Sequence, residues 1–192
     1  MSEPHSERSV RGVLFADYVR MIRRRKDVDW SKHLLPVDLE LLHGHVEPDA
    51  WYPMGSFERM GNAILAEIAG GDEQAVRLWG RLSVAPLAEQ YPALVAAHDP
   101  METLMRFHVL RSTFFDFAAV RVAMATPEQA ELEIHYYMGP VAEEAASYQT
   151  MGFFEGLLAL AGAVEIRARF RERSWEGAAR TLLALDYHLP HS

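Results

Sequence analysis

The sequence predicts an α+β domain, in which an N-terminal helical part is followed by a four-stranded antiparallel sheet. Two observations carry this prediction. Apolar residues recur at helical spacing through residues 10–115, and apolar and polar residues alternate in four later segments. These segments form two β-hairpins with a helix between them, and helices grouped beside an antiparallel sheet define the α+β class. We expect a disordered leader over residues 1–9 and a single domain over residues 10–188.

The helices of the first part have recognisable ends. Asp72 and Asp99 are typical N-cap residues, because an aspartate side chain accepts a hydrogen bond from a free backbone N–H of the first turn. Ser56 is expected to cap a helix that ends at Gly70-Gly71. The helices are predicted over residues 10–26, 37–42, 56–69, a stretch that begins after Asp72, and 100–115.

The four alternating segments are predicted strands over residues 118–124, 131–138, 164–170 and 180–188, and the helix between the hairpins covers residues 141–161. The second strand lies in the stretch "ELEIHYYMGP", residues 131–140. Its expected core face carries Leu132, Ile134, Tyr136 and Met138. The strand must stop at Gly139-Pro140, because proline cannot donate to the ladder of a central strand.

Composition excludes several classes of function. The formal net charge is −8, whereas a nucleic-acid-binding protein usually shows a basic footprint. Cysteine is absent, which excludes disulfides and thiolate chemistry and suits a cytoplasmic protein. No stretch reaches the roughly 20 apolar residues that a membrane span needs.

Few polar residues form a pattern that is typical of catalysis. No phosphate-binding loop, dinucleotide fingerprint or nucleophile–base pair is present, and we therefore expect no enzyme. His43 and His45 stand near Glu47 and Asp49, and this group is either a metal site or a polar surface loop. Glu143-Glu144 heads the helix over residues 141–161, where negative charge favours the helix dipole.

His108 is the candidate of greatest interest. It lies on the predicted helix over residues 100–115, among Leu104, Met105 and Phe115. Such a histidine is either a residue at the edge of the core or an axial ligand for heme iron, a role in which neutral imidazole is common.

The order and spacing of several stretches resemble the heme nitric-oxide/oxygen-binding domains, the H-NOX family. The stretches are "RGVLFADYV", "SFERMGNAILAEIAGGDEQAVRLWGR", "METLMRFHVL", "ELEIHYYMGP" and "MGFFEGLLALAGAVEIRARF". The resemblance covers roughly residues 9–187. It implies an H-NOX-like fold, heme as the cofactor and His108 as the ligand of its iron. It also implies that gas binding would strain the bond to His108 and shift its helix.

The resemblance breaks at the motif that holds the heme propionates. H-NOX domains carry Tyr-x-Ser-x-Arg on this strand. Tyr136 matches the tyrosine, but Met138 stands in place of the serine and Pro140 in place of the arginine. Two buried propionates without partners would be costly. Another cation (Arg121, Arg167 or Arg169) replaces the arginine, or the propionates face water, or no heme binds.

Two hypotheses follow for the function. The first is a non-catalytic H-NOX-like sensor or ligand-binding domain, with cofactor-binding residues His108, Tyr136 and Met138, that signals to a separate partner protein. The partner is expected because the chain has no room for an output domain. Its ligand would be a small gas or an apolar molecule.

The second hypothesis is a degenerate, heme-free domain that acts as a protein-interaction module, as a homodimer or alone, or binds a small apolar ligand. The chain is also similar to 4-vinyl-reductase-type domains, which need no heme. This hypothesis predicts that the side chains of Phe107, Phe154, Trp79 and Met138 fill the interior.

Overall fold

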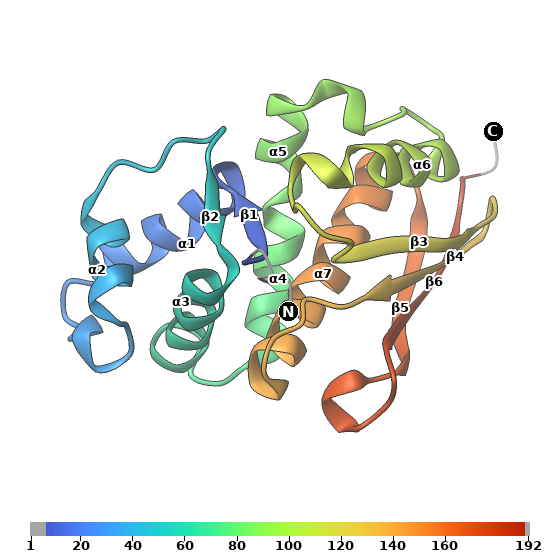
Figure 1. Cartoon of the computed structure of the whole chain (residues 1–192). Coiled ribbons are helices and arrows are strands. Elements are labelled where there is room, and N and C mark those ends of the chain that lie inside the picture. The colour runs from blue at the N-terminus through green and yellow to red at the C-terminus, as the bar shows by residue number, and fades with distance from the viewer. Residues whose placement is uncertain (1–6, 191–192) are drawn as a thin grey trace, which may run out of the picture. The chain divides into compact units, whose positions relative to one another are not determined.

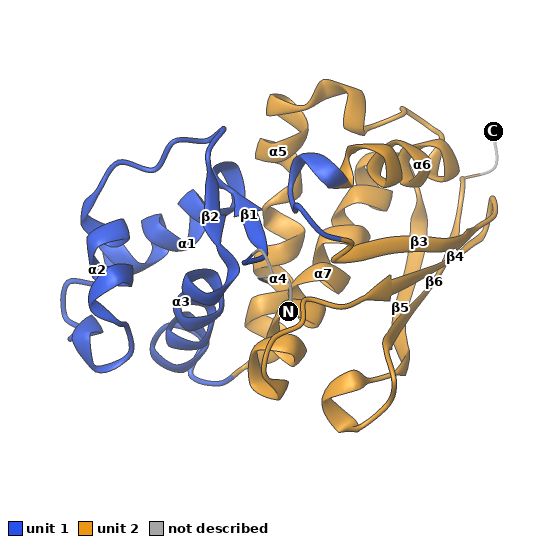
Figure 2. Ribbon diagram, viewed as in Figure 1, with its two compact units in different colours: residues 1–71, 112–117 blue, residues 72–111, 118–192 orange. Residues whose placement is uncertain are grey.

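The computed structural model describes residues 7–190, which divide into the two units coloured in Figure 2. Unit 1 contains the chain up to Gly71 together with Ser112–Phe117, and unit 2 contains Asp72–Arg111 and the chain from Ala118 onward. A single domain over residues 10–188 stays a prediction. Residues 1–6 of the expected leader lie outside the described residues, and Ser9 already begins a strand.

Unit 1 consists of helices and one short two-stranded sheet. Its elements in chain order are β1 (Ser9–Arg11), α1 (Gly12–Arg24), α2 (Pro36–His43), β2 (Trp51–Pro53) and α3 (Met54–Glu67). β1 and β2 pair antiparallel, with Val10 opposite Tyr52. The prediction of a helix that includes Val10 is therefore wrong. The backbone N–H of Arg11 instead donates to the carbonyl of Phe114, at 2.8 Å, and the helix starts only at Gly12.

Unit 2 contains the sheet. Its elements are α4 (Glu73–Leu82), α5 (Val84–Gln90), α6 (Pro100–Leu110), β3 (Val120–Ala125), β4 (Gln129–Ile134), α7 (Pro140–Leu160), β5 (Val164–Glu172) and β6 (Thr181–His188). The strand order is β3-β4-β6-β5, and every neighbouring pair is antiparallel (Figure 1). The predicted α+β fold, with hairpin, helix and hairpin, is confirmed.

The ends of several elements differ from prediction. Asp72 and Asp99 are N-caps as expected, since their carboxylates accept from the N–H groups of Gln74 and Glu102. Ser56 is not a cap, because α3 begins two residues earlier, at Met54. α6 ends at Leu110 and β4 ends at Ile134, so both are shorter than the predicted segments 100–115 and 131–138.

α4 and α7 approach each other closely because glycines lie between them. A Cβ atom on Gly80 would overlap the carbonyl oxygen of Gln149, and one on Gly152 would overlap that of Arg77. The buried carboxylate of Glu155 joins the same two helices. It accepts from Arg77, whose Nε lies 2.9 Å from Glu155 Oε2.

The core of the sheet lies on the face predicted from its alternation. Leu132 and Ile134 of β4 and Leu183 of β6 are fully buried. β6 also buries Leu182 and Ala184 on its other face, where they are 7% and 2% exposed and lie opposite longer charged residues of β4 and β5. Among the described residues, no helix is long and apolar enough to cross a membrane.

Candidate functional site

The segment that follows β4 is held against α7 by the side chain of Tyr136. The phenol is buried, and its oxygen lies 2.6 Å from the hydroxyl oxygen of Thr150. Thr150 donates its own proton to the carbonyl of Ala146, at 2.8 Å. A hydroxyl has a single proton, and the phenol must therefore be the donor to Thr150. Burial raises the pKa of Tyr136, so the proton stays on the phenol.

The backbone of the same segment is bound by a carboxylate of α7. Glu143 lies in the first turn of the helix and is 4% exposed. One of its oxygens accepts from the N–H of Tyr136, at 2.7 Å, and the other accepts from the N–H of Met138, at 3.1 Å. Both carboxylate oxygens are thus used within the protein. The expected favourable position at the helix N-terminus is correct, but this carboxylate also anchors the neighbouring segment.

Met138 and Pro140 contribute no polar side chain to this region. The side chain of Met138 is half-buried, and only its backbone N–H bonds to Glu143. Pro140 is exposed and begins α7, a position that suits proline because the first helical N–H needs no partner. Between Tyr136 and Met138, Tyr137 adopts a positive φ of 59°, so the backbone here is no longer a strand.

His108 lies near the end of α6 with its ring half-buried. Its Nδ1 atom is buried and makes no hydrogen bond to the described residues. Burial lowers the pKa of His108, and the charges of Arg111 and Arg121 lower it further. The imidazole is therefore neutral at pH 7, which is the form that binds a metal.

The candidate residues fit the iron of a heme better than its propionates. His108 offers a neutral imidazole, although a ligating histidine usually donates its second ring N–H to a fixed partner, and Nδ1 has none here. The hydroxyl of Tyr136 already donates its one hydrogen bond to Thr150. Glu143 would stand as a second carboxylate beside any propionate bound at this segment. The residues after β4 therefore do not fit the propionates of a heme.

The arginines that could replace the missing one are on the sheet, and two of them have other partners. Arg121 lies beside Glu133, with Nη2 2.5 Å from Glu133 Oε2, and Arg169 pairs with Asp186. Arg167 lies exposed on β5. The hydrogen bond from Arg121 lowers the pKa of Glu133, which keeps this pair charged.

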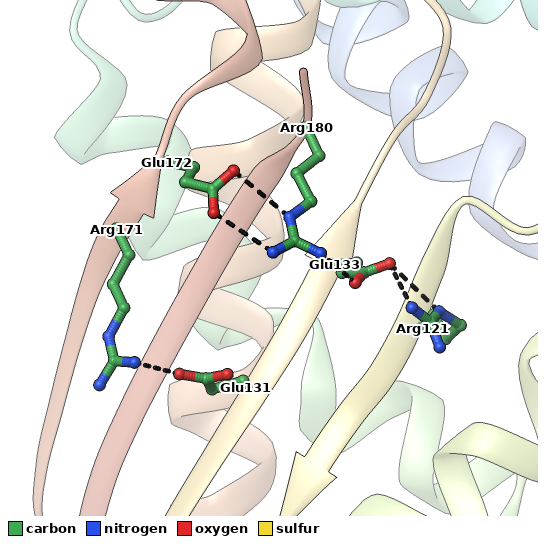
Figure 3. Close-up of polar contacts among 6 residues, drawn as sticks. All are labelled: Arg121, Glu131, Glu133, Arg171, Glu172 and Arg180. Carbon is green, nitrogen blue, oxygen red and sulfur yellow. Dashed lines mark hydrogen bonds and ion pairs between the residues drawn. The ribbon is translucent and has the colours of Figure 1, made fainter. Parts of the chain in front are cut away.

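Arg121 belongs to a larger network on the charged face of the sheet (Figure 3). Arg180 lies between Glu133 and Glu172, with Nη1 2.7 Å from Glu133 Oε1, and Arg171 pairs with Glu131. Exposed pairs of this kind contribute about 0–1 kcal/mol each. Positive and negative groups alternate across the strands. Arg121 is therefore paired with Glu133 within the sheet and does not replace the missing arginine of the motif.

The alternative metal site is not supported. Within residues 7–190, no group of three or more histidine, aspartate or glutamate side chains is arranged to hold a metal ion. His45 lies 3.3 Å from Glu47, and both side chains are largely exposed. This geometry is that of a polar surface loop.

Sequence reasoning named Tyr136 and His108 as candidates, and their roles stay predictions, but it did not indicate Thr150 or the contacts of Glu143. Glu143, Ser147 and Thr150 are spaced i, i+4 and i+7, which places them on one face of α7. All three are buried. Three polar residues on one buried face of a largely apolar helix are the signal that could have indicated a polar cluster.

Comparisons with known proteins place the fold. No protein-family model and no curated protein matches the chain. Solved structures of H-NOX domains do match it over nearly its whole length. An H-NOX protein from S. oneidensis in the Fe(II)NO ligation state is 11% identical, with a TM-score of 0.64, and the match covers 93% of this chain and 99% of that one.

Two further structures agree. A mutant of T. tengcongensis H-NOX is 14% identical, with a TM-score of 0.60 and coverage of 95% and 100%. An oxygen-binding H-NOX domain related to soluble guanylate cyclases, in its oxygen complex, is also 14% identical, with a TM-score of 0.58 and coverage of 92% and 94%. Matches with sequence identity this low show the fold but not the function. The chain therefore has the H-NOX fold.

Proposed function

We propose that this chain is a non-catalytic sensor or ligand-binding domain that signals to a separate protein. The observation that carries the proposal is His108, a half-buried neutral imidazole with a free Nδ1, on helix α6 of a chain with the H-NOX fold. If heme is the cofactor, His108 is the residue that would hold its iron, and iron is what such a group supplies for binding a small gas.

The test is an absorbance titration of the purified protein with hemin, under reducing conditions and with nitric oxide added afterwards. A heme sensor gives a saturable Soret band at one heme per chain, and His108→Ala shifts or abolishes it. His135→Ala is the matched control, since His135 is also half-buried in unit 2 but stacks on Tyr137, with ring centroids 3.7 Å apart. If the wild-type protein, His108→Ala and His135→Ala gave the same Soret band, His108 would not be the heme ligand and the heme-binding form of the proposal would be refuted.

A second candidate function is a heme-free domain, and a specific observation favours it. The hydroxyl of Tyr136 bonds to Thr150, and the N–H groups of Tyr136 and Met138 bond to Glu143, so these donors are not available to propionates. In addition, Phe107 of α6 packs edge-to-face on Phe154 of α7, with ring centroids 4.7 Å apart, and both side chains are buried, as the heme-free hypothesis expects. This candidate predicts that the protein is folded and stable without heme and that hemin produces no band dependent on His108.

One surface feature supports a separate partner. Met101, Met105 and Val109 are spaced i, i+4 and i+8 on α6, and their side chains are 39%, 45% and 73% exposed. Single exposed apolar residues are ordinary, but three in one row give a helix a continuous apolar edge. The row lies on the helix that carries His108, so a shift of that helix would move it.

A further inference from the structure

The sulfur chemistry of this chain belongs to methionine alone. The sequence has nine methionines and no cysteine, so no thiol competes with the thioethers for an oxidant. Among the methionines that the structure describes, only Met101 and Met105 are exposed, at 39% and 45%. The others are buried (Met54, Met60 and Met151) or half-buried (Met21, Met124 and Met138). An oxidant reaches a buried thioether only when the structure opens, so the two exposed sulfurs are the first to react.

The two exposed methionines share one face of a helix. Met101 and Met105 lie one turn apart on α6, and Val109, which is 73% exposed, continues the same row one turn further on. The residues that hold α6 in the core, including Leu104 and Phe107, lie on another face and are 0% and 6% exposed. The core packing of α6 therefore does not depend on the two thioethers.

Oxidation would change the character of this row. A hydroperoxide transfers its terminal oxygen to the methionine sulfur, so that the O–O bond breaks and an S–O bond forms. The thioether is oxidised by two electrons to a sulfoxide, and hydrogen peroxide is reduced to water. Because a sulfoxide is polar, two of the three apolar side chains in the row become polar, and enzymes that reduce methionine sulfoxide reverse the change.

We propose that Met101 and Met105 form a reversible oxidation site for hydroperoxides, and that their oxidation removes the apolar row of α6. This inference rests on the proposed function, in which the row supports a contact with a separate protein. Oxidation then weakens that contact without unfolding the chain, because both side chains are on the surface. The oxidation requires no ligand at His108.

Peptide mass spectrometry tests the site on the full chain, treated with hydrogen peroxide without hemin. Rates in the urea-unfolded chain give the intrinsic reactivity of each methionine. In the folded protein, oxygen should be added to Met101 and Met105 at least about tenfold faster than to Met60 and Met151, which are 0% and 2% exposed. The Tm of the protein oxidised at the two sites should stay within about 2 °C of the untreated value. Equal rates at all four residues, or a larger fall in Tm, would overturn the proposal.

Retention on a hydrophobic-interaction column reports on the row itself. The oxidised wild-type protein should elute earlier than the untreated protein, and methionine sulfoxide reductases should restore its retention. The double variant Met101→Leu with Met105→Leu keeps an apolar row of similar volume, and peroxide should not change its elution. Met21→Leu with Met124→Leu is the matched control, since it replaces two half-buried methionines outside α6 and should still shift as the wild type does. An equal shift in the two double variants would contradict the proposal.

Failure of this inference can be distinguished from failure of the proposed function. Oxidation and elution are measured without heme, whereas the hemin titration depends on the imidazole of His108. Absence of a Soret band that depends on His108 leaves the oxidation site intact, and unselective oxidation of the methionines leaves the sensor proposal intact.

Discussion

Replacing Tyr136 with phenylalanine should reveal what its hydroxyl group does. The ring stays in place and no cavity forms, so the change removes the hydrogen bond to Thr150 without changing the packing. A buried hydrogen bond between neutral groups contributes about 0.5–1.5 kcal/mol, and we expect the free energy of unfolding to fall by about 1 kcal/mol. Thr150→Val should cost more, about 2 kcal/mol, because it removes the acceptor of a buried phenolic proton.

The measurement is a double-mutant cycle from urea unfolding of the two single variants and the double variant at pH 7. A coupling free energy of about 1 kcal/mol is expected, with unchanged m-values. Tyr137→Phe is the control, since Tyr137 is 49% exposed and its variant keeps the stacked ring. The reasoning is refuted if the coupling is below about 0.3 kcal/mol, or if Tyr136→Phe leaves stability unchanged while weakening the binding of hemin.

Two further predictions concern stability. Gly152→Ala should lower the free energy of unfolding by about 3 kcal/mol, because its Cβ would overlap the carbonyl of Arg77. In the control Gly55→Ala, the new Cβ meets only flexible side chains, and the free energy of unfolding should change by less than about 1 kcal/mol. Equal urea midpoints for the two variants would contradict this. Burial by itself raises the pKa of Asp38, but hydrogen bonds led by Arg59 outweigh it and leave that pKa below its usual value. The ionised Asp38 carboxylate therefore stabilises the fold fully above its unfolded pKa of about 3.9, and this stabilisation is lost as the pH falls through the folded pKa. Asp38→Asn should lower stability at pH 7 and make stability depend less on pH in the acid range, as measured in thermal melts at pH 2–7.

The sequence predicted those features that depend on local pattern. The alternation in β4 identified Leu132 and Ile134 as core residues, and Asp72 and Asp99 marked helix starts because capping is a contact within three residues. β1 was missed because a strand of three residues shows little more than one period of alternation.

The same reasoning explains the error at the end of β4. Tyr136 continues the buried alternation, so the pattern could not show that the ladder stops at Ile134. The bonds of Tyr136 to Glu143 and Thr150 depend on where α7 docks, and no local pattern encodes that position.

The glycine contact between α4 and α7 has a mechanical consequence. Side chains between two helices can change rotamer and absorb a small displacement, but Gly80 and Gly152 bring backbone against backbone. We therefore expect α7 and α4 to move together as one rigid unit. α7 begins at the segment that Glu143 anchors, and α4 exposes Leu78 and Leu82, at 52% and 63%. Release of that anchor would thus be felt at the surface of another helix, without any chain of side-chain rearrangements between them.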